Sequence, residues 1–177
     1  MNIVKTDIDG LLIIEPKVWR DSRGCFLETF QRDRYRAMGI EQSFVQDNFS
    51  VSTRGALRGL HFQNTKPQGK LVTCLSGRVL DVVVDLRVDS STRGQPFSIV
   101  LDAVNGTQLW IPPGFAHGFS VLSEMAHFYY KCTDFYFPDD EAGILWCDPD
   151  LKIDWQIPTP IVSPKDQRLP LLRDVLS

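Results

Sequence analysis

Imidazole and ammonium groups stand close together in the sequence, in an arrangement that suits proton transfer. His61 lies in RGLHFQ and Lys70 in QGKLV, with the turn-like residues 64–68 between them. Two strands joined by this short loop would place His61 opposite Lys70 on one face of a hairpin. The ammonium group would then keep the imidazole neutral and basic, and it would stabilise a developing oxyanion. An exposed hairpin with two unrelated polar residues is the alternative, and spacing alone favours it.

A phenol group is the second candidate for proton transfer. Tyr130 lies in a strand-like segment and shares one face with Phe128 and Cys132. Spacing alone favours a core tyrosine with a hydrogen-bonded hydroxyl. The functional alternative is a general acid that faces a histidine base.

The histidines do not form a metal-binding motif. The sequence has 3 of them, His61, His117 and His127, and none has a second histidine two positions away. Metal-binding β-barrel enzymes commonly need such a pair, together with a glutamate and a later histidine. A Gly-rich dinucleotide-binding loop is also missing. We therefore expect neither a metal nor a redox cofactor.

The elements that must position these groups are mostly strands. Short runs of β-branched and aromatic residues alternate with turn residues, which indicates an all-β protein. One helix is predicted over Arg32–Met38, ended by Gly39. This pattern is typical of a jelly-roll barrel with short peripheral helices. The predicted strands are Leu11–Pro16, Cys25–Phe30, Phe44–Ser50, Leu71–Leu75, Val79–Leu86, Phe97–Leu101, Gln108–Ile111, Gly118–Leu122 and His127–Phe135.

The predicted strand Val79–Leu86 has two unlike faces. Leu80, Val82 and Val84 form an apolar face, whereas Asp81 and Asp85 alternate with valines on the other. Because successive side chains point to opposite faces of a sheet, this strand is expected to be buried on one side. Its other side should line something polar.

Length and composition favour one folded domain. The 177 residues are 43% hydrophobic and 23% charged, which is enough for a packed core. We expect a single domain over 1–177, with the barrel at about 20–150 and a C-terminal wrap at about 151–177. The net charge of −3, from 19 basic and 22 acidic residues, argues against a nucleic-acid partner.

The ends of the chain and the cysteines give an expected location. No basic region followed by a long apolar run is present at the N-terminus, and the apolar run Leu11–Ile14 is too short to cross a membrane. The 4 cysteines are isolated from one another, which suits a reducing compartment. We expect a soluble, cytoplasmic protein with no membrane partner.

Several segments, taken together, resemble the dTDP-4-dehydrorhamnose 3,5-epimerase family. The resemblance runs in order from about Arg20 to Leu172, so it covers nearly the whole chain. It implies a cupin-type barrel without metal or cofactor, acting as a homodimer. The matching segments are RDSRGCFLETF, FVQDNFS, RGLHFQ, QGKLV, WIPPGFAHGF, YYKCTDFY and SPKD.

The reaction that the resemblance implies is inversion of C3 and C5 of dTDP-4-dehydro-6-deoxy-D-glucose, through an enolate, to dTDP-4-dehydro-L-rhamnose. By motif, His61 would be the base, and Asp166 of SPKD would hydrogen-bond to it. Lys70 would stabilise the C4 enolate, and Tyr130 would deliver a proton to the opposite face.

The resemblance also implies a set of substrate-binding residues. Phe26 and Tyr136 are candidates for stacking on the thymine, and arginines suit the pyrophosphate because their planar fork matches paired oxygens. The binding set is Arg23, Glu28, Gln46, Asp47, Asn48, Arg58, Lys70, His117, Glu141 and Lys165.

Other functions stay open at the level of sequence. An epimerase of a related dTDP-4-keto-deoxysugar that acts at C3 only or C5 only would keep the same histidine and tyrosine. A non-catalytic cupin that binds a sugar nucleotide would be expected to lose His61, Tyr130 or Asp166, and all three are present. A metal-dependent cupin oxygenase is disfavoured by the missing histidine pair, and metal analysis of the purified protein would detect it.

Overall fold

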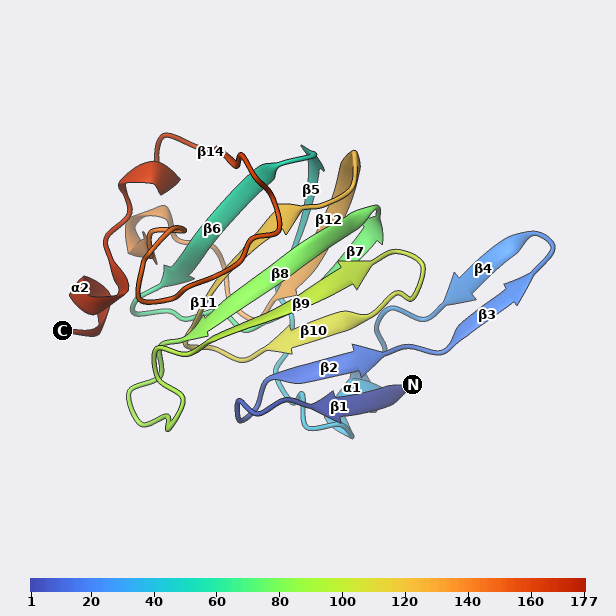
Figure 1. Ribbon diagram of the computed structural model, residues 1–177. Coiled ribbons are helices and arrows are strands. Elements are labelled where there is room, and N and C mark those ends of the chain that lie inside the picture. Colours follow the sequence, from blue (N-terminus) through green and yellow to red (C-terminus); the bar gives the residue numbers. More distant parts are fainter.

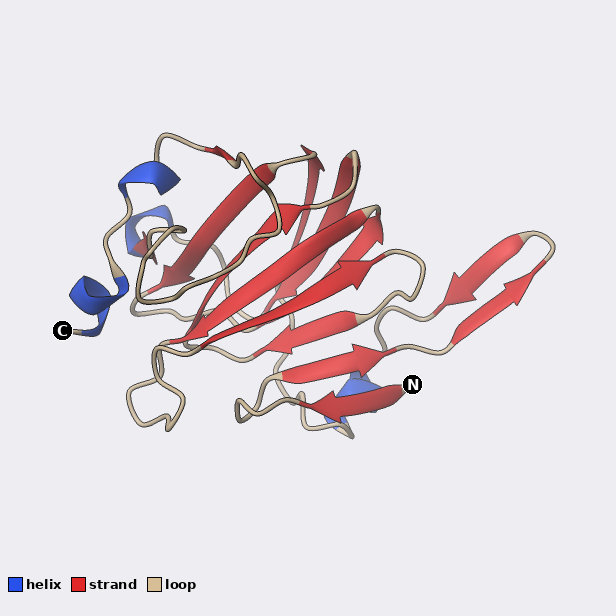
Figure 2. Cartoon of the chain, in the orientation of Figure 1, coloured by secondary structure: helices blue, strands red, loops and turns tan.

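Two facing antiparallel β-sheets form the body of the protein in a computed structural model that describes residues 1–177 (Figure 1). Strands account for most of the regular structure, as Figure 2 shows. The first sheet has the order β1 (Asn2–Lys5), β2 (Leu12–Glu15), β10 (Gln108–Ile111), β7 (Lys70–Ser76), β12 (Met125–Cys132) and β5 (Gln46–Thr53). The second has the order β13 (Glu141–Gly143), β6 (Ala56–Gln63), β11 (Phe115–Val121), β8 (Arg78–Asp85) and β9 (Pro96–Asp102), and β14 (Ile161–Val162) pairs with β6 in parallel.

The remaining elements lie outside the two sheets. An arm formed by β3 (Val18–Asp21) and β4 (Gly24–Leu27) extends away from the barrel (Figure 1). The helix α1 (Arg32–Arg36) starts after Gln31, whose side chain accepts a hydrogen bond from the Arg34 amide at 2.6 Å. A second helix, α2 (Leu172–Leu176), ends the chain, and short 3₁₀ turns lie at Pro138–Asp140 and Asp166–Arg168. Neither α-helix is long and apolar enough to cross a lipid bilayer.

Aromatic and aliphatic side chains fill the space between the sheets. Phe128 of the first sheet stacks on Phe119 of the second, with ring centroids 4.3 Å apart. Val83 of β8 points into the same core, whereas the preceding residue, Val82, packs on the opposite face of the sheet. That outer face is covered by residues from the last part of the chain, including Leu151, Trp155 and Leu172. The C-terminal segment is therefore held against the second sheet by apolar burial.

The fold-class prediction is confirmed, and the individual strand predictions are largely right. Gln108–Ile111 coincides with β10, and the other predicted segments overlap β2, β4, β5, β7, β8, β9, β11 and β12. The predicted polar face of Val79–Leu86 is the inner face of β8, where Asp81 is completely buried and hydrogen-bonds to a histidine of β11. Both faces of β8 are buried, rather than one, because the C-terminal segment covers the outer face.

The predicted hairpin between His61 and Lys70 is wrong. β6 and β7 belong to different sheets, and Lys70 lies opposite Ile111 and Cys132 instead. The chain crosses between the sheets after Gln63, whose side chain donates to the Lys66 and Phe135 carbonyls at 2.7 and 3.2 Å. Asp140 also accepts hydrogen bonds from the amides of Thr65 and Lys66. The contacts that involve Phe135 and Asp140 join residues far apart in the sequence, so the local sequence does not reveal the crossing.

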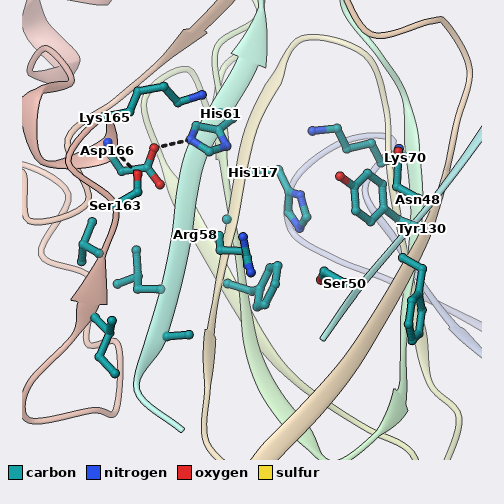
Figure 3. Close-up of a pocket in the computed structure, with 17 residues that line it drawn as sticks. Asn48, Ser50, Arg58, His61, Lys70, His117, Tyr130, Ser163, Lys165 and Asp166 are labelled. Carbon is teal, nitrogen blue, oxygen red and sulfur yellow. Dashed lines mark hydrogen bonds and ion pairs between the residues drawn. The ribbon is translucent and has the colours of Figure 1, made fainter. Parts of the chain in front are cut away.

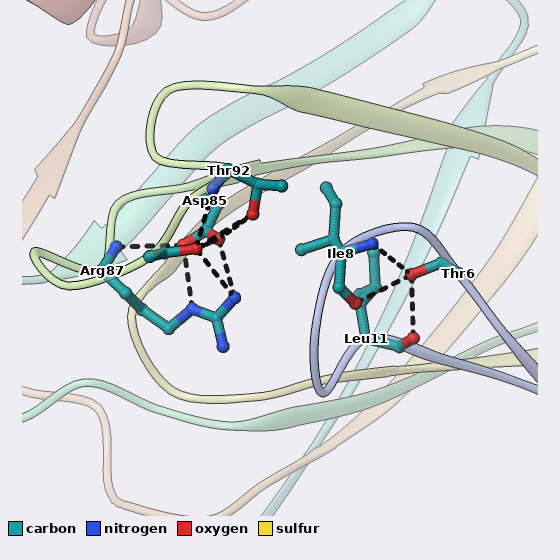
Figure 4. A network of polar contacts seen from close by, with 7 residues as sticks. Thr6, Ile8, Leu11, Asp85, Arg87 and Thr92 are labelled. Carbon is teal, nitrogen blue, oxygen red and sulfur yellow. Dashed lines mark hydrogen bonds and ion pairs between the residues drawn. The ribbon is translucent and has the colours of Figure 1, made fainter.

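A buried carboxylate at the end of β8 organises one end of the barrel (Figure 4). Asp85 is fully buried and accepts hydrogen bonds from Arg87 at 2.7 Å, Ser90 at 2.6 Å and Thr92 at 2.7 Å. Burial opposes ionisation, but these hydrogen bonds outweigh it and hold the pKa of Asp85 well below its usual range. Asp85 therefore fixes the loop between β8 and β9.

Replacing Asp85 tests this contribution. Asp85→Asn is expected to lower the free energy of unfolding by about 1–3 kcal/mol at pH 7, because the partners lose a charged acceptor. The folded-state pKa is depressed, so the stabilisation is present above the unfolded-state value of about 3.9 and is lost as pH falls through the folded-state value. Urea unfolding of both proteins between pH 7 and pH 3 measures the difference. A variant as stable as the wild type at pH 7 would contradict the assignment.

Candidate active site

A cavity of about 590 Å³ opens between the two sheets and receives side chains from both (Figure 3). The first sheet contributes its wall through β5, β7 and β12, and the second through β6 and β11. The C-terminal segment closes one side. The polar side chains that line the cavity are Asn48, Ser50, Lys70 and Tyr130 from the first sheet, Arg58, His61 and His117 from the second, and Ser163, Lys165 and Asp166 from the C-terminal segment.

An imidazole–carboxylate pair joins β6 to the C-terminal segment. His61 Nε2 donates to Asp166 Oδ1 at 2.7 Å, and Asp166 is buried. The carboxylate also accepts from the Gly59 amide at 3.3 Å, and the Asp166 amide donates to Ser163 Oγ at 3.1 Å. Burial opposes ionisation of Asp166, but the His61 and Gly59 hydrogen bonds outweigh it and lower its pKa. With Nε2 engaged by a carboxylate, Nδ1 is the ring nitrogen left to accept a proton.

The facing wall holds a phenol and an ammonium group. Tyr130 of β12 packs on Phe128 with ring centroids 6.1 Å apart, and it also lines the cavity. Burial raises the pKa of Tyr130 to about 12, so the hydroxyl keeps its proton at neutral pH. Lys70 Nζ lies 6.0 Å from the Tyr130 ring centroid, and burial lowers the pKa of Lys70. His61 and Tyr130 therefore face one cavity from opposite sheets.

A second imidazole–carboxylate pair lies at the base of the cavity. His117 of β11 is directly opposite His61 in the strand register. Its Nε2 donates to Asp81 Oδ2 at 2.8 Å, and both side chains are buried. The sequence placed Asp81 on a polar strand face but did not single it out as a site residue. Its position between apolar neighbours in Val79–Leu86 was the available signal.

Three other predicted residues meet at the rim of the cavity. Lys165 Nζ donates to Glu141 Oε2 at 2.7 Å, and the Tyr136 hydroxyl donates to the same oxygen at 2.8 Å. Glu141 Oε1 is 4.0 Å from His61 Nδ1. Burial opposes ionisation of Glu141, but the bonds from Lys165 and Tyr136 outweigh it and lower its pKa. Glu141 thus stays ionised near the free nitrogen of His61.

The predicted residues of β5 lie on both sides of the first sheet. Asn48 lines the cavity and accepts a hydrogen bond from Gln46 Nε2 at 3.1 Å. Gln46 also accepts from the Tyr136 amide at 2.9 Å. Asp47 is not among the lining residues. Its carboxylate accepts instead from Lys131 at 2.8 Å and from the Tyr129 hydroxyl at 2.9 Å.

The arm carries predicted residues that this chain does not bring to its own cavity. Arg23 is exposed at the tip of the arm and pairs with Asp21 at 2.6 Å. Glu28, just after β4, pairs with Arg34 at 2.9 Å. Phe26 on the arm is also exposed. None of them lines the cavity between the sheets. Sequence reasoning missed Ser50 and Ser163, whose residue types carry no specific signal.

Fold and site together define a class of protein. A two-sheet barrel whose cavity holds an imidazole–carboxylate pair, a lysine and a protonated phenol is a cupin-type protein equipped for proton transfer. No group of three or more His, Cys, Asp or Glu side chains is arranged to hold a metal ion.

Comparison with known proteins identifies the family. The sequence profile of dTDP-4-dehydrorhamnose 3,5-epimerase matches residues 5–174. The enzyme of that name from Escherichia coli (strain K12) is 48% identical, over 99% of this chain and 97% of its own length. The crystal structure of dTDP-6-deoxy-D-glucose-3,5-epimerase from Legionella pneumophila Philadelphia 1, in complex with dTDP-4-keto-L-rhamnose, is 53% identical. Its superposition on this chain has a TM-score of 0.94, and the match covers 97% of this chain and 93% of the Legionella chain. The chain belongs to the dTDP-4-dehydrorhamnose 3,5-epimerase family.

One relative has a narrower name. The dTDP-4-dehydrorhamnose 3-epimerase of Streptomyces niveus is 41% identical, over 98% of this chain and 85% of its own length. Enzymes named as 3-epimerases and as 3,5-epimerases therefore share this sequence pattern.

Removing the charge of Asp166 tests the imidazole–carboxylate pair. Asp166→Asn is expected to reduce turnover by about 10²–10⁴-fold with little change in KM, because His61 loses the carboxylate that fixes its tautomer and supports its charged form. Steady-state kinetics on the folded variant measures this effect. Asp102→Asn is a suitable control, since Asp102 bonds only to nearby turn residues. Turnover of Asp166→Asn within a few-fold of the wild type would contradict the assignment.

Proposed function

We propose that this protein inverts C3 and C5 of dTDP-4-dehydro-6-deoxy-D-glucose and forms dTDP-4-dehydro-L-rhamnose, with His61 as base and Tyr130 as acid. Family membership supports the reaction and the class of substrate. The placement of His61 and Tyr130 on facing walls of one cavity carries the assignment of roles. Inversion needs one group to remove a proton from one face of a carbon and another to deliver a proton to the other face.

The first step removes a proton from the carbon next to the ketone. His61 Nδ1 accepts it, and the electron pair of the broken C–H bond moves toward C4, so an enolate forms with negative charge on the C4 oxygen. Lys70 donates to that oxygen and stabilises the charge. Asp166 holds the imidazolium that His61 becomes, through the hydrogen bond of 2.7 Å.

The second step returns a proton from the opposite side. Tyr130 donates its hydroxyl proton to the same carbon, the enolate electrons form the new C–H bond, and the C4 ketone is restored. The phenol then regains a proton from solvent while His61 releases its own. One round at C3 and one at C5 complete the reaction, with no external oxidant or reductant. The high pKa of Tyr130 suits this role because the group enters each round protonated.

The remaining cavity residues bind and orient the nucleotide sugar in this proposal. Arg58 at the cavity wall suits the pyrophosphate, because its guanidinium offers paired donors to phosphate oxygens. Asn48, His117 and Lys165 provide further hydrogen-bonding groups around the ligand. The ion pair between Lys165 and Glu141 spans the rim next to His61.

We also propose a homodimer in which the arm of one copy reaches the cavity of the other. Arg23 and Glu28 do not line the cavity of their own chain, so a role in binding the nucleotide would require the cavity of a second copy. Trp19 and Phe26 on the arm are exposed and pack on each other, with ring centroids 5.9 Å apart. Exposed apolar side chains of this kind favour an association surface.

Solvent exchange tests the reaction. Incubation with the 4-keto-6-deoxy nucleotide sugar in heavy water is expected to place deuterium at both C3 and C5 of the product, because each removed proton is replaced from solvent. Proton NMR and mass spectrometry measure the incorporation. Deuterium at one carbon only would instead identify a C3-only or C5-only epimerase. No incorporation with any 4-keto sugar would contradict catalysis and favour a binding protein.

Subunit complementation tests the dimer. Co-expression of Arg23→Ala with His61→Ala is expected to restore about a quarter of wild-type activity, since random pairing gives half mixed dimers with one intact site each. The matched control is Tyr130→Phe co-expressed with His61→Ala. Both of these changes lie in the cavity, so no mixed dimer has an intact site. Equal activity of the two co-expressed pairs would rule out a shared site.

A further inference from the structure

Asp81 is a buried carboxylate next to the cavity with only half of its hydrogen-bonding capacity used. Its Oδ2 atom accepts from His117 Nε2 at 2.8 Å, whereas Oδ1 is buried and has no hydrogen-bond partner. The side chain is completely inaccessible to solvent. Burying a carboxylate in this way costs free energy, and Asp81 lacks the several hydrogen bonds that satisfy Asp85 on the same strand. The position of Asp81 therefore calls for a role in the site.

The charged and titratable groups around Asp81 come from several strands. Burial raises the pKa of Asp81, and the contact with His117 of β11 and the charge of Lys70 of β7 oppose that shift. Burial raises the pKa values of Tyr130 and Cys132 on β12, so both stay neutral. The other groups that face this part of the cavity are Arg58 and His61 of β6, Asp166 bonded to His61, and Glu141 of β13 bonded to Lys165.

This arrangement leaves Asp81 as the carboxylate available to His117 and Lys70. Asp166 hydrogen-bonds to His61, and Glu141 accepts hydrogen bonds from Lys165 and Tyr136 at the rim. Burial lowers the pKa of Lys70, and the negative charge of Asp81 is one of the neighbouring charges that raise it again. Asp81 therefore helps to keep a proton on Lys70.

We propose that Asp81 is a positioning residue for oxyanion binding. This inference rests on the proposed function. Asp81 holds His117 through Nε2, so that Nδ1 is the nitrogen presented to the substrate. It also balances the positive charge that Lys70 directs at the C4 oxygen.

Positioning by Asp81 should stabilise the enolate more than the bound ketone substrate. The C4 oxygen is uncharged in the ketone and negative in the enolate, so groups held in place for an anion stabilise the transition state selectively. A buried ammonium such as Lys70 loses its proton more readily when no negative charge lies nearby. With the Asp81 carboxylate nearby, Lys70 keeps the proton that it donates as the charge develops.

Replacing Asp81 separates a positioning role from a structural one. Asp81→Asn keeps the size of the side chain and an acceptor for His117 but removes the charge. We expect kcat to fall by about 10–100-fold with little change in KM. We also expect the alkaline limb of the kcat–pH profile to move to lower pH, because Lys70 then loses its proton more readily.

Asp85→Asn is the matched control, since it removes an equally buried carboxylate from the same strand but at the end of the barrel. It is expected to lower stability and to leave kcat and the alkaline limb unchanged. If Asp81→Asn also loses only stability, Asp81 is structural and the inference is overturned. A wild-type enzyme that does not turn over the 4-keto sugar would instead overturn the proposed function.

A measurement on the wild type covers the case in which Asp81→Asn does not fold. Nitrogen-15 NMR of histidine-labelled protein reports which ring nitrogen carries a proton. We expect the proton of the neutral ring to lie on Nε2 of His117, because Nε2 donates to Asp81. A neutral His117 protonated at Nδ1 and bare at Nε2 would overturn the inference.

Discussion

The hydrogen bond between His61 and Asp166 is the interaction on which the rest of the site depends. Its 2.7 Å length joins β6 of the second sheet to a segment that follows much later in the chain. The carboxylate reaches the histidine only because Trp155 and Leu172 pack the C-terminal segment on the outer face of that sheet. Apolar burial therefore fixes a polar contact, and that contact sets which nitrogen of His61 is free to accept a proton.

The two-sheet barrel solves the main geometric requirement of an inversion. Side chains of facing sheets approach a bound ligand from opposite directions, so His61 and Tyr130 can act on opposite faces of one carbon. A histidine and a tyrosine on neighbouring strands of one sheet would share a face and could only exchange a proton with retention. Lys70 lies on the tyrosine side, and Asp81 hydrogen-bonds to His117. In the proposed mechanism, the cavity thus combines an acid, a base and a site for the C4 oxygen.

The sequence predicted those features that depend on local pattern. Alternation in Val79–Leu86 identified β8 and its polar inner face, and the predicted strand Gln108–Ile111 matched β10. The proposed catalytic set came from the family resemblance, since spacing alone favoured a structural role for His61 and Tyr130. Which strands share a sheet was not predictable, because Gln63 and Asp140 hold the crossing between β6 and β7 through long-range contacts. The position of Arg23 away from the cavity of its own chain also depends on tertiary structure.

Separating proton removal from proton delivery tests the central claim most directly. A substrate deuterated at C5 would be incubated in ordinary water with Tyr130→Phe and with His61→Ala, and both loss of label and configuration would be followed. The account predicts that Tyr130→Phe loses label without inversion, because His61 removes the deuteron and returns a solvent proton to the same face. His61→Ala is predicted to do neither while remaining folded. Rapid loss of label in His61→Ala would contradict the account.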